Sequence, residues 1–235
     1  MSGAAALELT RVVKDYKGLR PLRIASLVVG RGERVAISGL DKPAAEALIA
    51  LITGAALPDE GQVRVLGRAT TDIKSGDEWL SSLDRLGIVS ERVALLESST
   101  LAQNLALSFT MSIDPVAPAV MEKVLALADE VGLDKSNIDN RAGDSPPEVR
   151  LRVLVGRALP YDPAVLLLEH PTASISPAAI AAFADDVARV VKARGLTSLA
   201  ITEDATFANR AADRHLKLNP ATGEFVDAQK RRWFR

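Results

Sequence analysis

The stretch "DPAVLLLEHP" constrains the fold of this chain most strongly, because Ala164–Leu168 is an unbroken apolar run between turn-forming residues. A strand with one solvated face alternates polar and apolar residues, whereas a continuous run of this length is typical of a central strand covered on both faces. A helical pattern follows at 177–194, then the strand "TSLAIT", a helix through "ATFANRAAD" and the strand "HLKLN". This alternation predicts an α/β fold.

The N-terminal part of the chain is rich in strand patterns. "ALELTRVV" and "RIASLVVGRGERVAISG" are β-branched and apolar, with breaks at glycines, and "PDEGQVRVLGR" continues this pattern. Between them "AAEALIALITG" predicts a helix that ends at Gly54. Residues 91–159 are mostly helical in pattern, with "STLAQNLALSF", "PAVMEKVLALADEVGL" and "PPEVRLRVLVGRAL" as the candidate helices, which predicts a helical lobe inserted into the α/β core.

Composition limits the classes of partner. The formal net charge is -1, so the chain has no overall basic field for non-specific nucleic-acid binding, and we expect no nucleic-acid partner. There are no cysteines, which suits a reducing compartment, and no apolar window reaches the roughly 18 residues of a membrane helix. We therefore expect a cytoplasmic protein whose membrane association, if any, is peripheral. The basic, aromatic tail 227–235 is more typical of a solvated end than of a membrane contact.

The turn "SGLDKPAAEAL" has the position of a phosphate-binding loop but lacks its residues. The pattern G-x-x-x-x-G-K-[ST] presents backbone N–H groups, a lysine and a hydroxyl to phosphates and magnesium. Here the four slots are Gly39, Ala44, Ala45 and Glu46, and Lys42 comes three residues too early for the lysine slot. The same residues suit an ordinary helix start, with Asp41 as the cap, Pro43 at the beginning and Glu46 facing the positive end of the helix.

Several longer stretches resemble the ATP-binding cassette (ABC) family, the nucleotide-hydrolysing subunits of ABC transporters. They are "LITGAALPDEGQVRVLGR", "ALLESSTLAQNLAL", "RALPYDPAVLLLEHPTASISP" and "ITEDATFANRAADRHLKL", in one collinear order over nearly the whole chain. The resemblance implies a P-loop NTPase-like cassette, with a mixed sheet core, a β-rich N-terminal subdomain and an inserted helical lobe. It places the core at 1–90 and 160–226 and the helical signature subdomain at 91–159.

The resemblance also assigns roles to positions whose residues have changed. Glu169 aligns with the magnesium-orienting aspartate, His170 with the glutamate that polarises the attacking water, and Glu203 with the switch histidine. Glu91 takes the place of the glutamine-loop ligand and Ser176 that of the D-loop aspartate, whereas Tyr16 matches the adenine-stacking aromatic or packs on its own sheet. The signature motif aligns with Ser145, Pro146, Pro147 and Glu148, which also spell the capping-box pattern S-x-x-E.

These substitutions predict a pseudo-ATPase with no catalytic residues and no cofactor. Four carboxylates would meet in a cleft that must hold a triphosphate, unless Lys42, nearby arginines or raised carboxyl pKa values settle the charges. We expect His170 to be a hydrogen-bonded histidine at a strand end. A weak alternative is a hard-cation site at Glu46, Glu91 and Glu169.

Three functions remain open at this point. The first is a non-catalytic scaffold or regulator that docks a membrane permease on the inner face of the cell membrane and pairs with a second cassette, as a homodimer or a heterodimer. The second is a slow ATPase that binds ATP and magnesium through displaced groups such as Lys42 and His170. The third is a soluble interaction module.

Overall fold

The core of the molecule is a six-stranded mixed sheet. The computed structural model describes residues 5–228, and the core sheet has the order β10-β9-β3-β8-β7-β6. All neighbouring pairs are parallel except β10 with β9. The strands are β3 (Arg34–Ser38), β6 (Leu86–Val89), β7 (Val165–Glu169), β8 (Thr197–Ile201), β9 (Arg214–Leu218) and β10 (Phe225–Asp227). All five residues of β7 are buried, which confirms the central strand predicted from its apolar run.

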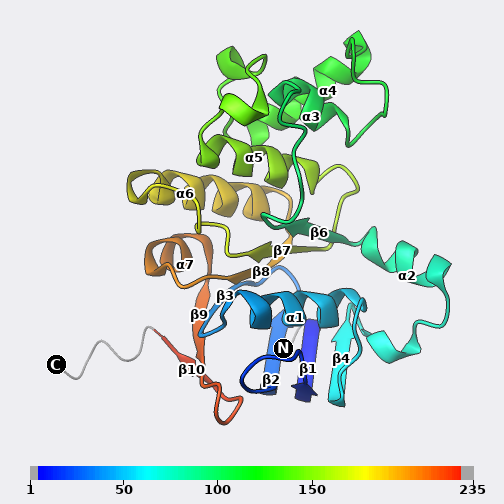
Figure 1. Ribbon diagram of the computed structural model, residues 1–235, viewed down its shortest axis with the longest axis vertical. Coiled ribbons are helices and arrows are strands. Elements are labelled where there is room, and N and C mark those ends of the chain that lie inside the picture. Colours follow the sequence, from blue (N-terminus) through cyan, green and yellow to red (C-terminus); the bar gives the residue numbers. More distant parts are fainter. Residues whose placement is uncertain (1–4, 229–235) are drawn as a thin grey trace.

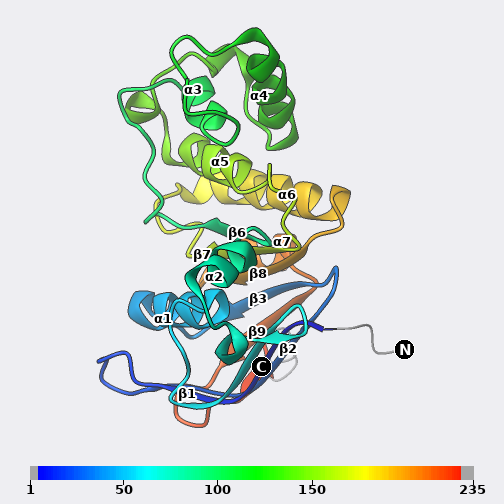
Figure 2. The ribbon, with the colours of Figure 1, turned by 90° about the vertical axis from the view of Figure 1, so that its right-hand side faces the viewer.

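A second, antiparallel sheet lies at one end of the molecule (Figures 1 and 2). Its order is β2-β1-β4-β5, formed by β1 (Ala5–Lys14), β2 (Leu22–Gly30), β4 (Glu60–Val65) and β5 (Arg68–Ala69). Helix α1 (Lys42–Thr53) packs between this sheet and one face of the core sheet. Its residues Ala44, Leu48, Leu51 and Ile52 are buried, as its helical pattern predicts, and Gly54 ends the helix in the left-handed conformation.

The other face of the core sheet is covered by helices. Alternate residues of a strand point to opposite faces, so Val165 and Leu167 pack towards α1, whereas Leu166 and Leu168 pack on the other side. There they meet α6 (Pro177–Ala193) and α7 (Ala205–Ala211). The same apolar cluster continues into α3 (Leu101–Ala106), α4 (Pro118–Glu130) and α5 (Pro147–Arg157), which form the end of the molecule opposite the antiparallel sheet (Figure 1).

Most predicted elements are present, and some short ones were not predicted. Helix α2 (Gly76–Leu83) and strands β5, β6 and β10 have no counterpart among the sequence patterns quoted above. Three 3₁₀ turns, Thr70–Asp72, Lys135–Asn137 and Ala142–Asp144, complete the regular structure. Within residues 5–228 no helix combines the length and the apolar character needed to cross a membrane. Most of the predicted basic tail, from residue 229, lies outside the described residues.

Candidate functional site

The turn after β3 is closed by the protein's own side chains. Gly39 has a φ of +90°, and a Cβ at this position would lie 2.6 Å from the carbonyl oxygen of Leu218, so only glycine fits. Its N–H donates to Oε1 of Glu203 at 2.6 Å. Beside it, Ser38 Oγ lies 3.2 Å from Nε2 of the buried His215. A backbone amide that faces the ligand in a phosphate-binding turn is therefore already bonded to a carboxylate.

Helix α1 starts as an ordinary capped helix. Asp41 is its N-cap and accepts a hydrogen bond from the N–H of Ala44 at 2.9 Å, as predicted. The helix begins at Lys42, one residue before Pro43. Ala45, in the lysine slot of the motif, is completely buried in the apolar cluster around α1. The prediction that Glu46 complements the positive end of the helix is wrong. This residue lies beyond the first helical turn, and its carboxylate is paired with an arginine.

Arg92 makes that pairing and is the central residue of the cleft. Its two terminal nitrogens donate to Glu46 Oε1 and to Glu169 Oε2, both at 2.6 Å. Arg92 follows β6, Glu46 lies on α1 and Glu169 ends β7, so one guanidinium joins three separate segments. The side chain of Glu169 is only 8% exposed, whereas that of Arg92 is 48% exposed. The arginine therefore neutralises a buried carboxylate from the solvent side.

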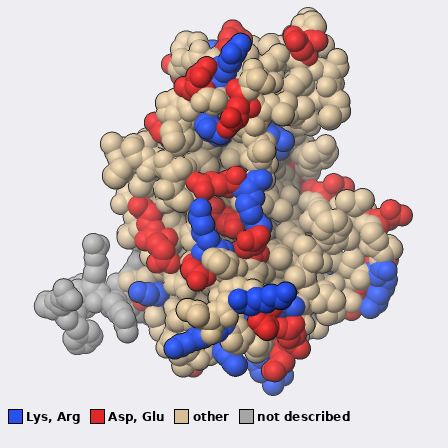
Figure 3. Space-filling model, viewed as in Figure 1, with Lys and Arg blue, Asp and Glu red and all other residues tan. Residues whose placement is uncertain are grey.

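A second ion pair lies in the same cleft, whereas Glu203 accepts the N–H of Gly39. Lys42 Nζ lies 3.4 Å from Glu91 Oε2, in an exposed pair. Burial alone would lower the pKa of Arg92, but its hydrogen bonds and its attraction to Glu169 and Glu46 outweigh burial and raise that pKa above the usual value. Figure 3 shows the resulting surface, where acidic and basic side chains are interleaved between α1 and the helical end of the molecule. Lys42 and Arg92 therefore balance the carboxylates of Glu91, Glu46 and Glu169.

His170 directly follows β7 in a strained conformation. Its φ is +43°, and its backbone N–H donates to the carbonyl of Ile201 at 2.8 Å. Its side-chain Nε2 is buried and has no hydrogen-bond partner among the described residues. The expectation of a hydrogen-bonded imidazole is therefore wrong for Nε2, because no described polar group reaches the ring there.

Tyr16 lies beside the same turn. It lines a pocket of about 230 Å³ together with Gly39, Asp41 and Ala44, and it packs against the apolar cluster of the antiparallel sheet. Partial burial and the nearby Asp41 carboxylate raise the pKa of its phenol. Both roles foreseen for this residue, a ring that packs on its own sheet and a ring open to a ligand, are compatible with this position.

The signature-equivalent segment does not form a capping box. The N-cap of α5 is Pro146, which makes no side-chain bond, and the helix begins at Pro147. Ser145 therefore lies one position before the cap, and its Oγ donates to the carbonyl of Arg141 at 2.8 Å. Glu148 is the second helical residue rather than the third, so the prediction is wrong by one position. Ser176 is the N-cap of α6 and also makes no side-chain capping bond.

A groove separates the signature-equivalent segment from the loop after β6. It has a volume of about 490 Å³. Its walls include Leu151 and Leu154 of α5, with Glu91, Val93 and Ala94 opposite. The ion pair of Arg150 with Glu97, at 3.2 Å, joins the two walls. The groove thus has a mixed lining, with leucine side chains of α5 beside charged and polar groups.

No cation site is formed in the described part of the chain. Residues 5–228 contain no group of three or more His, Cys, Asp or Glu side chains that could hold a metal ion. The alternative at Glu46, Glu91 and Glu169 is not supported, because Arg92 and Lys42 take the places next to these carboxylates.

Arg92 was not singled out from the sequence. It lies 46 positions from Glu46 and 77 from Glu169, so no local spacing connects the three residues. The only signal was indirect: several carboxylates at aligned positions required a compensating cation somewhere in the chain.

Comparison with known proteins gives consistent matches. A family model described as ABC transporter matches residues 22–173. Methionine import ATP-binding protein MetN 4 of Oceanobacillus iheyensis is 29% identical over 212 residues, which cover 88% of this chain and 61% of the relative. Phosphonates import ATP-binding protein PhnC of Anaeromyxobacter dehalogenans is 33% identical over 202 residues, covering 81% of this chain and 39% of the relative. The chain thus spans less than two thirds of the length of these curated relatives.

Solved structures share the fold. The cbiO1 protein of Clostridium perfringens, part of the ABC transporter complex cbiONQ, has a TM-score of 0.78 at 19% identity, over 94% of this chain and 87% of that one. A dimeric bacterial ABC transporter cassette has a TM-score of 0.73 at 22% identity, over 90% of this chain and 94% of that one. These likenesses confirm the predicted P-loop NTPase-like cassette fold with its mixed sheet.

Proposed function

Because the chain belongs to the ABC transporter family, we propose that it is a non-catalytic cassette subunit, a scaffold or regulator of a transport system. The observation that supports this most directly is the pairing of Arg92 with Glu46 and Glu169. In an active cassette the aligned positions coordinate magnesium and face the phosphates. Here Glu46 and Glu169 both bind Arg92 instead.

The other replacements also weaken the binding of a nucleotide triphosphate. Phosphoryl transfer depends on positioning and on electrostatic stabilisation of the phosphoryl group. Ala45 is buried and carries no charge, Glu203 occupies the N–H of Gly39, and Pro146 and Pro147 have no N–H to donate at the start of α5. A site built from this chain's turn and a site completed by its signature segment would both lack donors for a triphosphate.

The proposal also assigns partners and location. The curated relatives are named as import ATP-binding proteins, and one similar structure is a dimer. We therefore propose that the chain pairs with a second cassette and lies at the inner face of the cell membrane. The groove between α5 and the loop after β6 is suited to an amphipathic helix of a permease, since it presents Leu151 and Leu154 beside charged side chains.

The absence of nucleotide binding is tested by thermal melting with millimolar MgATP. We expect no shift in the melting temperature, because the phosphate-facing groups are engaged internally. Tyr16→Ala is the matched control, because it removes the aromatic ring that lines the pocket beside Gly39. A shift of several degrees in the wild type that is lost in Tyr16→Ala would contradict the proposal.

The docking groove is tested by isolating the native complex from detergent-solubilised membranes. Ala94→Trp places a large side chain at an exposed wall of the groove and should release the membrane subunit. Ala221→Trp adds the same side chain at an exposed position in the turn before β10 and should retain it. A native complex without any membrane subunit would favour a soluble interaction module instead.

A slow ATPase is the second candidate, and His170 is the observation that favours it. The imidazole Nε2 has no partner among the described residues, so it is free to act as a base, but it is buried and the site must open before it can reach a substrate water. This candidate requires phosphate release above background that disappears in His170→Ala. Absence of release, alone and with any partner cassette, would remove it.

A further inference from the structure

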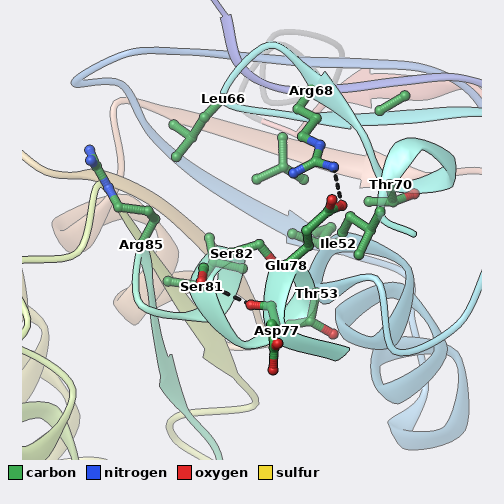
Figure 4. A pocket seen from close by; sticks show the side chains of 14 residues that line it. Ile52, Thr53, Leu66, Arg68, Thr70, Asp77, Glu78, Ser81, Ser82 and Arg85 are labelled. Atoms are coloured by element: carbon green, nitrogen blue, oxygen red, sulfur yellow. Dashed lines mark hydrogen bonds and ion pairs between the residues drawn. The ribbon is translucent and has the colours of Figure 1, made fainter. Parts of the chain in front are cut away.

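A separate pocket lies under helix α2, at the end of α1 opposite the cleft (Figure 4). It has a volume of about 430 Å³, within the range of roughly 300–1,000 Å³ that is usual for small-molecule sites. One wall is the C-terminal end of α1 with Ile52, the second is the β4–β5 hairpin with Leu66 and Ala69, and the third is α2 with the start of β6. Nothing in the proposed transport role uses this pocket.

Small residues on α2 keep the pocket open. None of the eight residues of α2 is buried, and the helix lines the pocket with Asp77, Glu78, Ser81 and Ser82, none of them apolar. Larger apolar side chains at these positions would fill the space, and filling a cavity normally stabilises a protein. The open space is therefore maintained at a cost in stability, which a bound ligand would offset.

Fixed contacts prevent α2 from collapsing onto the pocket. Trp79 Nε1 donates to the carbonyl of Thr53 at 2.9 Å, and Arg68 pairs with Glu78 at 2.6 Å. The first contact ties α2 to α1 and the second ties it to the hairpin. The pocket is held open by bonds on both sides.

The groups that face the pocket are already engaged, and the carboxylate of Asp77, which also lines it, points away from the hairpin wall (Figure 4). The Arg68 guanidinium is shared between Glu78 and the carbonyl of Asp72, and the hydroxyls of Ser81 and Ser82 donate to carbonyls of their own helix. The guanidinium of Arg85 points away from the cavity (Figure 4). A charged ligand would lose its hydration without gaining an unpaired partner inside. We infer that this pocket binds an uncharged, largely apolar small molecule.

Two fluorescent probes with the same aromatic skeleton test the inference. N-phenyl-1-naphthylamine is neutral, whereas 1-anilinonaphthalene-8-sulfonate carries a sulfonate. We expect saturable binding of the neutral probe to the full chain with one site, and binding of the anionic probe weaker by at least about tenfold. Equal affinity for both probes, or no saturable binding of the neutral one, would overturn the inference.

Matched variants locate the probe. Ser82→Phe fills the pocket and should weaken binding of the neutral probe by at least about tenfold, and Ser81→Phe, at an exposed position beside it, should weaken it in the same direction. Leu80→Phe adds the same ring on α2 at a side chain that is 56% exposed and outside the pocket, so binding should be unchanged. Thermal melting identifies any variant that fails to fold. If one of the two serine variants does not fold, the other still tests the inference. Unchanged binding in both serine variants would also overturn the inference.

Discussion

At the scale of single residues, Arg92 determines the chemistry of the cleft. Its removal as Arg92→Met leaves the buried carboxylate of Glu169 without a counter-charge. Because the arginine is itself half exposed and water can replace part of its effect, we expect a loss of about 1–2 kcal/mol in the free energy of unfolding. Urea denaturation at neutral pH measures this loss.

A double-mutant cycle provides the control. With Glu169→Gln in the background no buried charge remains, so Arg92→Met should cost clearly less than in the wild type. Equal costs in the two backgrounds would show that Arg92 does not stabilise Glu169. The exposed pair of Arg210 with Asp185 is a useful reference, because its loss should matter less than that of Arg92.

His215 gives a prediction about pH. Burial lowers its pKa, although the carboxylates of Glu203 and Asp227 act in the opposite direction. A histidine with a lowered folded-state pKa binds fewer protons in the folded state than in the unfolded state. Its stabilising contribution is therefore complete above the ordinary pKa of about 6.5 and is lost as the pH falls through the folded-state pKa.

We expect the melting temperature to fall between pH 7 and pH 5, and to fall less in His215→Gln. The matched control is a change at the other histidine, as His170→Gln. If His215→Gln leaves the pH dependence of the melting temperature as it is in the wild type, His215 is not the group responsible.

At the scale of elements, the start of α1 is an ordinary helix cap at the position where the resemblance places a phosphate-binding turn. Asp41 accepts from the N–H of Ala44, so Asp41→Ala should cost about 1 kcal/mol of unfolding free energy. Asp41→Asn retains an equivalent acceptor and should cost little. Chemical denaturation of both variants checks the prediction, and a similar loss in the two would mean that charge rather than capping is responsible.

Elements with strong local signals could be predicted from the sequence, and those without them could not. The apolar run of β7, the glycine stop after α1 and the cap at Asp41 are local, and all are present. Helix α2 was missed because it is short and its apolar face is limited to Trp79 and Leu83, too few residues to show a helical period. The capping box at Ser145 failed because Pro147 starts the helix one position later than the motif requires.

At the scale of the whole molecule, the fold is retained while the cleft is closed by its own ion pairs. The sequence predicted the cassette fold and the loss of the phosphate-binding residues, but it did not show where compensating charge comes from. That charge is Arg92, which depends on α1, β6 and β7 being brought together by the tertiary structure. Residues that meet only in the tertiary structure, such as Arg92, Glu46 and Glu169, have no fixed spacing in the sequence that could reveal their contact.

Isothermal titration of the full chain with ATP, with and without magnesium, tests this account most directly. Because Glu46 and Glu169 are paired with Arg92 and the N–H of Gly39 is bonded to Glu203, we expect no saturable heat in either condition at millimolar ATP. Saturable one-to-one binding that is strengthened by magnesium would contradict it, since such binding requires the Arg92 ion pairs to open and the carboxylates to accept a nucleotide-bound cation.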